Sequence, residues 1–142
     1  MDFSQAFAIS AAGMSVQRMR VEVAALNLAN AHSVQAPGAA AFQPLRVLVS
    51  PSVPFDALVS EGLQPGALPG ATVQATEVSP RLVHDPGHPL ADARGFVHQA
   101  AVDPATEMVT LMSAMRSYEA NVAALNTART LALKTLEIGR GT

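Results

Sequence analysis

The most constraining feature of this 142-residue chain is the position of its ten prolines, all of which lie between Pro37 and Pro104. Proline breaks the interior of a helix, because it lacks a backbone N–H and its ring collides with the preceding turn. The arms on either side contain no proline and are free to form long helices. The sequence therefore predicts a mainly α protein with a small β insert: an N-terminal helix in residues 1–36, a central Pro/Gly-rich β/loop domain in 37–104 and a C-terminal helix in 105–142.

The C-terminal arm carries apolar residues in two rows with a period of seven residues. One row contains Leu111, Tyr118, Leu125 and Ala132, and the other contains Met108, Met115, Val122 and Leu136, interrupted by Arg129. Interleaved, the two rows place apolar side chains three and four positions apart, which is the spacing of one helix face. Such a seam on a helix of roughly 35 residues, about 50 Å long, requires a partner.

Both ends of this arm have the chemistry of helix termini. Asp103 can accept hydrogen bonds from the first free amides, and Pro104 suits the first helical position, where no amide is needed. Gly139 can take the left-handed backbone conformation that closes a helix, with Lys134 and Arg140 near its negative end. We therefore expect the helix to begin at Pro104 and to close at Gly139.

The N-terminal arm is apolar around most of its circumference. Its main seven-residue row is Phe7, Met14, Val21 and Leu28, and further rows leave only a polar strip of Gln17, Arg18, Arg20 and Glu22. A helix of this kind is expected to be buried on several sides. The alternative is a core helix of a small globule, but the Pro/Gly-rich centre offers little mass to enclose two long helices. Assembly with other chains is therefore the preferred interpretation.

The two arms are expected to pair as an antiparallel coiled coil. A compact insert brings the end of the first helix close to the start of the second, which forces the helices to run in opposite directions. The period of seven in both arms is typical of a shared seam. We expect Leu28 near residues 108–112 and Phe7 near residues 133–136.

Two asparagines stand at the end of the N-terminal arm. Asn27 and Asn30 are three residues apart and share a helix face, so they can bond to a neighbouring helix or to freed backbone carbonyls. The alternative is a fraying helix end, where asparagine is common.

The centre has the composition of short strands and loops. Residues 45–49, 72–76, 81–84 and 95–98 are candidate strands, and residues 51–70 form a proline-rich loop. His84, His88 and Asp92 are candidate metal ligands, but Pro86 and Pro89 exclude a helix that would place the two histidines on one face. A tight turn with two solvated histidines is the preferred interpretation.

Composition excludes several kinds of function. The chain has no cysteine, which removes disulfides, thiolate catalysis and cysteine metal sites. A net charge of −2 provides no basic footprint for nucleic acid or anionic lipid. Residues 1–20 do not have the pattern of a secretory signal. No nucleophile elbow or Gly-rich phosphate loop is present, so we expect no enzyme activity, no cofactor, no metal and no small-molecule substrate.

Three stretches carry a resemblance to a known family. Asn27-Leu28-Ala29-Asn30 resembles the N-terminal motif shared by the axial proteins of the bacterial flagellum. The segment from Glu107 to Arg140 resembles their C-terminal signature. The run Leu82-Val83-His84-Asp85-Pro86-Gly87-His88-Pro89-Leu90-Ala91-Asp92, with Gly95-Phe96-Val97, is more discriminating and resembles the proximal-rod proteins of the flagellar basal body.

The resemblance implies a structural subunit of the axial drive shaft, with its terminal helices paired in an inner tube and its centre facing outward. It also implies unfolded export through the flagellar type III apparatus without a cleaved signal, and assembly in the periplasm. The implied partners are other copies of the chain, other rod proteins, the export apparatus and membrane-ring components. A cytosolic helical adaptor is the alternative function. The predicted assembly interface consists of Phe7, Met14, Val21, Asn27, Leu28, Asn30, Leu111, Met115, Tyr118, Val122, Leu125 and Leu136.

Overall fold

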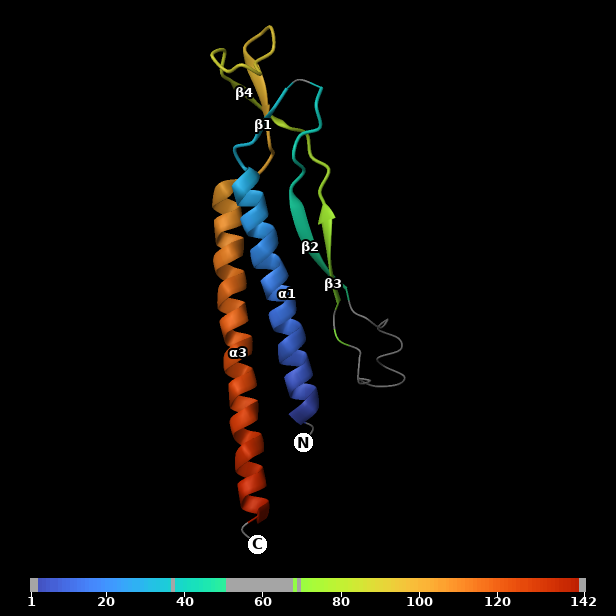
Figure 1. Ribbon diagram of the computed structural model, residues 1–142, viewed down its shortest axis with the longest axis vertical. Helices are drawn as coiled ribbons and strands as arrows, with labels where there is room; N and C mark the ends of the chain where they lie inside the picture. The colour runs from blue at the N-terminus through green and yellow to red at the C-terminus, as the bar shows by residue number, and fades with distance from the viewer. Residues whose placement is uncertain (1–2, 37, 51–67, 69, 141–142) are drawn as a thin grey trace. The chain divides into compact units, whose positions relative to one another are not determined.

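The computed structural model describes residues 3–36, 38–50, 68 and 70–140. These residues form two long helices and five short strands (Figure 1). In chain order the elements are α1 (Phe3–Asn30), β1 (Val34–Gln35), β2 (Leu45–Ser50), β3 (Gly70–Ala75), β4 (Arg81–His84), β5 (Phe96–Gln99) and α3 (Pro104–Arg140). The predicted mainly helical fold with a small sheet region is confirmed.

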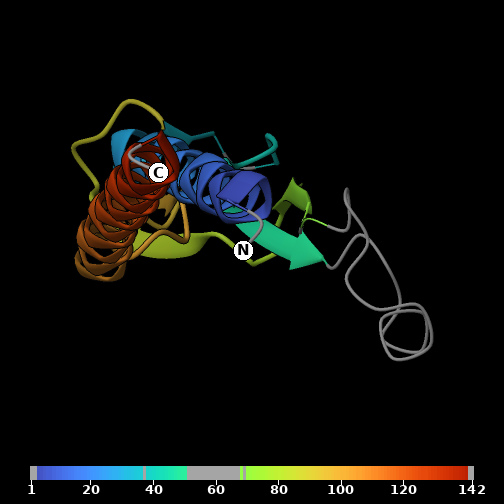
Figure 2. The same cartoon turned by 90° about the horizontal axis from the view of Figure 1, so that it is seen from below.

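The two helices pack against each other, and the chain divides into two compact units. Unit 1 contains Met1–Met19, Leu48–Thr72 and Ser113–Thr142, and unit 2 contains Arg20–Val47 and Val73–Met112. Within each unit, the α1 and α3 segments lie side by side and run in opposite directions (Figures 1 and 2). The expected antiparallel sense is therefore observed.

The start of α3 follows the sequence prediction. Pro104 is its first residue, and the Asp103 carboxylate accepts hydrogen bonds from the Ala105 N–H at 3.3 Å, the Thr106 N–H at 3.2 Å and the Thr106 hydroxyl. These bonds, led by the Thr106 hydroxyl, hold the pKa of Asp103 below its usual value. A lowered carboxyl pKa stabilises the fold only while the group is ionised. The cap is therefore lost as the pH falls through the folded-state pKa.

The predicted closure at Gly139 is wrong. The helix continues through Gly139 to Arg140, and among the described glycines only Gly38 and Gly95 have a positive φ. Glycine permits the left-handed conformation but does not require it. No hydrogen bond or contact pulls the described chain out of the helix at this point, so the helical ladder continues.

All four predicted strands are present, with boundaries that differ by up to two residues. The strand that sequence reasoning missed is β1, whose two residues pair antiparallel with Gln99 and His98 of β5. The sheet has the order β1-β5-β4, and β2 pairs with β3 separately. A two-residue strand has no periodic signal of its own, because only its distant partner defines it. The predicted loop at 51–70 lies almost entirely outside the described residues.

The face of α3 that lies against the rest of the chain is lined mainly by small and polar residues. Buried and half-buried positions on this face include Glu107, Leu111, Ala114, Asn121, Leu125, Ala128 and Ala132. The predicted row of Leu111, Leu125 and Ala132 is therefore on the covered face, although Tyr118 is 40% exposed. From the second predicted row, Met108, Met115 and Leu136 are exposed, and only Val122 is half-buried. The two rows do not share one covered face, because Ala114 and Asn121, and not the methionines, face inward.

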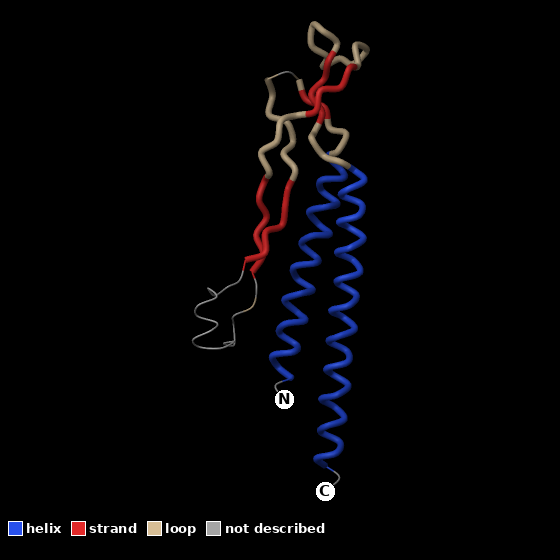
Figure 3. Tube along the Cα trace, turned by 180° about the vertical axis from the view of Figure 1, so that it is seen from behind, coloured by secondary structure: helices blue, strands red, loops and turns tan. Residues whose placement is uncertain are grey.

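A close approach in unit 1 fixes the helix register. A Cβ added to Gly13 of α1 would lie 2.7 Å from Asn121 Oδ1 of α3, so the backbone of α1 at Gly13 touches the Asn121 side chain. Counting six residues back along α1, Phe7 lies level with Thr127 and not with residues 133–136. The expected position of Phe7 along α3 was therefore wrong by about two turns. The end of α3 extends beyond the start of α1 within this unit (Figure 3).

This register predicts a specific disulfide. Cysteines replacing Gly13 and Asn121 should cross-link within one chain of the assembled protein, because their Cβ atoms would lie within the range that a disulfide spans. The natural chain has no cysteine, so any cross-link detected on a non-reducing gel comes from the introduced pair. A matched pair at Gly13 and Ala128 should stay reduced, since position 128 lies ~10 Å further along the helix. Preferential linking of 13 to 128 would contradict the register.

Candidate assembly interface

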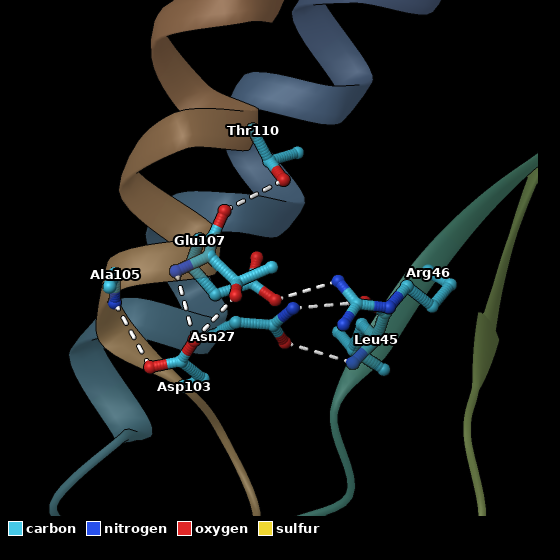
Figure 4. Close-up of polar contacts among 8 residues, drawn as sticks. Asn27, Leu45, Arg46, Asp103, Ala105, Glu107 and Thr110 are labelled. Carbon is cyan, nitrogen blue, oxygen red and sulfur yellow. Dashed lines mark hydrogen bonds and ion pairs between the residues drawn. The ribbon is translucent and has the colours of Figure 1, made fainter.

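Asn27 joins α1 to the start of β2. Its side chain is fully buried, its Nδ2 donates to the Leu45 carbonyl at 2.9 Å, and its Oδ1 accepts from the Leu45 N–H at 2.8 Å (Figure 4). The carboxamide thus satisfies both backbone groups of one residue, as a neighbouring strand would. Sequence reasoning expected a helix or freed carbonyls as the partner. The actual partner is a strand that lies 18 residues further along the chain.

The next residue of β2 connects to the other helix. Arg46 Nη1 lies 2.6 Å from Glu107 Oε1, and the Glu107 side chain is only 2% exposed, whereas that of Arg46 is 47% exposed (Figure 4). Glu107 lies in the first turn of α3, where a negative charge is favoured by the helix dipole. Two adjacent residues of β2 therefore bind α1 and α3, and both contacts lie inside unit 2.

Sequence reasoning assigned no role to Glu107 or Arg46. An acidic residue in a first helical turn is usually read as a solvated cap, and a lone arginine in a strand gives no signal. The distance of 61 residues between them explains why no local pattern reveals the pair.

Asn30 closes its own helix. Its Nδ2 donates to the Leu26 carbonyl at 2.8 Å, and the Ser33 hydroxyl donates to the Asn30 carbonyl at 2.8 Å. Asn30 thus bonds within its own helix and not to a neighbouring helix. The two asparagines of the motif therefore have different tasks, one holding a strand and the other ending a helix.

The remaining predicted interface residues divide by exposure. Those half-buried within the chain are Phe7, Met14, Val21, Leu28, Leu111, Val122 and Leu125. Those exposed are Met115 at 48%, Tyr118 at 40% and Leu136 at 64%. The first group can support the contact between α1 and α3, while the second is available to another molecule.

The exposed apolar side chains of α3 form what we call the outer apolar face. It consists of Met108, Val109, Met112, Met115, Tyr118, Leu131, Leu133, Leu136 and Ile138, with exposures from 40% to 73%. Exposed apolar side chains in this number are typical of a surface that contacts another molecule. Methionine is common at such surfaces because its unbranched chain adapts to the partner.

The turn between β4 and β5 is held by its own hydrogen bonds. Asp92 Oδ1 accepts from the Phe96 N–H at 2.9 Å and the Arg94 N–H at 2.8 Å, and these bonds, led by that from Phe96, lower the pKa of Asp92. His88 Nδ1 accepts from the Leu90 N–H at 3.1 Å, and the His84 ring contacts Phe96 edge-on. Among the described residues, no three acidic, histidine or cysteine side chains gather as a metal site would require.

No helix in the described part of the chain combines the length and the apolar character needed to cross a membrane.

Comparison with known proteins identifies the family. A family model described as the C-terminal domain of flagellar basal body rod FlgEFG proteins matches residues 93–138. The flagellar basal-body rod protein FlgC of Escherichia coli O6:H1 is 42% identical over 94% of this chain and 96% of its own length. FlgC of Bacillus subtilis strain 168 is 34% identical over 93% and 95%, and FlgC of Aquifex aeolicus is 36% identical over 96% and 97%. The chain belongs to the FlgC family.

This FlgC-family protein is a structural subunit of the flagellar basal-body rod and not an enzyme. It assembles with other rod proteins and serves motility. The matched segment 93–138 contains α3 up to its last two residues and the strand before it. It therefore includes both the buried Glu107 and the outer apolar face.

Replacing Asn27 by alanine should weaken unit 2. The change leaves the N–H and C=O of Leu45 without partners in a buried place, which costs about 1–3 kcal/mol per buried group. In purified basal bodies, the denaturant concentration that releases the Asn27→Ala subunit should be clearly lower than for the natural subunit. Asn30→Ala removes only a local bond at an exposed helix end and is the matched control. If both variants were released at the same denaturant concentration, the role of Asn27 in holding β2 to α1 would be contradicted.

Proposed function

We propose that this FlgC-family subunit polymerises through its paired terminal helices, which form an antiparallel coiled coil that builds the inner wall of the proximal rod. The observation that carries the proposal is the outer apolar face of α3. One side of this helix is covered by the same chain, while the side away from it exposes Met108 at 53%, Val109 at 63% and Met112 at 58%. In a rod, the helices of neighbouring subunits would cover this surface.

The register supports a coiled-coil seam. Gly13 contacts Asn121 in unit 1, and in unit 2 Asn27 and Glu107 line the same junction with β2. The two α1 positions are fourteen residues apart, and so are the two α3 positions. Fourteen residues are two heptads, the repeat that keeps the same faces of two helices together.

The predicted interface divides into two roles. Residues half-buried within the chain, such as Leu125 and Phe7, hold the helix pair. Exposed residues, such as Met115 and Tyr118, contact neighbours. Asn27 and Asn30 act on assembly indirectly, because their bonds shape the subunit.

Export and location complete the proposal. The subunit passes unfolded through the flagellar type III apparatus and is incorporated in the periplasm, above the membrane ring and the export gate. Membership in the FlgC family supports this route. The central strands face outward from the rod. A cytosolic adaptor role has no specific observation in its favour.

Replacing Leu125 by aspartate should abolish incorporation into the rod and stop motility. A carboxylate at this half-buried seam position would be desolvated without a partner, which costs several kcal/mol. The measurement is the amount of variant subunit in purified basal bodies, together with swimming in soft agar. Thr127→Asp introduces the same charge two residues away at an exposed position and should be tolerated much better. A swimming strain with Leu125→Asp in its basal bodies would refute the seam assignment.

Replacing Met115 by glutamine should block assembly while leaving the helix pair intact. Glutamine has a similar shape, but burying its amide against a neighbour costs about 1–3 kcal/mol. We expect incorporation to fall about tenfold or more in competition with the natural subunit. The disulfide between cysteines at 13 and 121 should still form, which shows that the chain itself folds. Glu119→Gln, at an exposed position, is the control. Unchanged incorporation of Met115→Gln would contradict the role of the outer apolar face.

A further inference from the structure

Unit 2 contains a cavity of about 210 Å³ that is walled by α1, β2 and the first turns of α3. Its polar walls are Arg20, Arg46, Glu107 and Thr110. Its apolar walls are Val23, Ala24, Leu45 and Val47. The two hydrogen bonds between Asn27 and Leu45 hold β2 against α1, and so they keep two walls of this cavity together.

The cavity carries uncompensated positive charge. Arg46 uses Nη1 to bind Glu107, while its side chain is 47% exposed and its guanidinium has further N–H donors. Arg20 is half-buried and makes no ion pair with any residue that the structure describes. Two guanidinium groups therefore face a single carboxylate.

The polar groups on the α3 wall do not neutralise this charge. Glu107 Oε2 is buried without a hydrogen-bond partner, so solvent does not reach it. The Thr110 hydroxyl donates to the Thr106 carbonyl at 2.9 Å, within its own helix. The accessible charge of the cavity therefore lies on the two arginines.

We propose that this cavity receives the carboxylate of an aspartate or glutamate side chain from a neighbouring rod subunit. The inference rests on the assembly role proposed above. Guanidinium groups bind carboxylates through paired, charge-assisted hydrogen bonds, and two of them provide more donors than one carboxylate can use. Val23, Ala24 and Val47 provide an apolar wall for the aliphatic part of the incoming side chain. The occupant is thus fixed by charge on one side of the cavity and by hydrophobic contact on the other.

The first test compares two changes at Arg20. Arg20→Gln removes the charge at similar length, and Arg20→Lys keeps the charge. Each tagged variant is co-expressed with the natural subunit, and its share in purified basal bodies is divided by its share in the whole cell. We expect Arg20→Gln to fall at least about 30-fold, as for truncation of a desolvated charge partner, and Arg20→Lys to fall much less. Incorporation of Arg20→Gln at the natural level would overturn the proposal. The disulfide between cysteines at 13 and 121, introduced into each variant, verifies that a poorly incorporated subunit is folded.

The second test identifies the occupant. A photoreactive residue replaces Val47 in the apolar wall, basal bodies are irradiated, and linked peptides are sequenced. A peptide from another subunit with Asp or Glu at or next to the linked position supports the proposal. Links confined to the same chain, or to a peptide without an acidic residue, overturn it. Absence of the natural subunit from basal bodies would instead refute the assembly role, so the two failures are distinguishable.

Discussion

The buried carboxamide of Asn27 is the contact on which the arrangement of unit 2 depends. Leu45 is the first residue of β2, and its N–H and C=O need partners. Asn27 provides both at 2.8 and 2.9 Å from the last turn of α1. Aspartate lacks the donor and leucine lacks both groups, so asparagine suits this position for a definite chemical reason. Because Arg46 directly follows Leu45, the same strand also reaches Glu107, and β2 is bound to both helices.

The buried ion pair is a second constraint of a different kind. A carboxylate with 2% exposure is tolerated only when it is paired, and removal of Arg46 would leave Glu107 with an uncompensated charge. The position of Glu107 in the first turn of α3 reduces this cost through the helix dipole. The pair therefore joins the start of α3 to β2 specifically, whereas apolar contacts alone would allow sliding.

The division of α3 into two faces connects the fold to the function of a rod subunit. Ala114 and Asn121 on the inner face allow α1 to approach closely, as the contact at Gly13 shows. The methionines Met108, Met112 and Met115 remain outside, where the chain itself does not cover them. In the arrangement proposed for this FlgC-family protein, the same helix would hold its own chain together and present an apolar surface to the next subunit.

The sequence by itself determined the two helices, four of the five described strands, the cap at Asp103 and the class of structural assembly protein. These features are local: proline exclusion, heptad spacing and turn residues act within a few positions of each other. The tertiary structure decided which face of α3 turns inward, where α1 stands along it, and what Asn27, Arg46 and Glu107 do. An apolar period gives the direction of a stripe but does not distinguish contact within a chain from contact between chains. The distance between two packed helices depends on small residues such as Gly13, which contribute nothing to a pattern of hydrophobic residues. Long-range pairs separated by 18 or 61 residues have no local trace in the sequence, because chain folding alone brings them together.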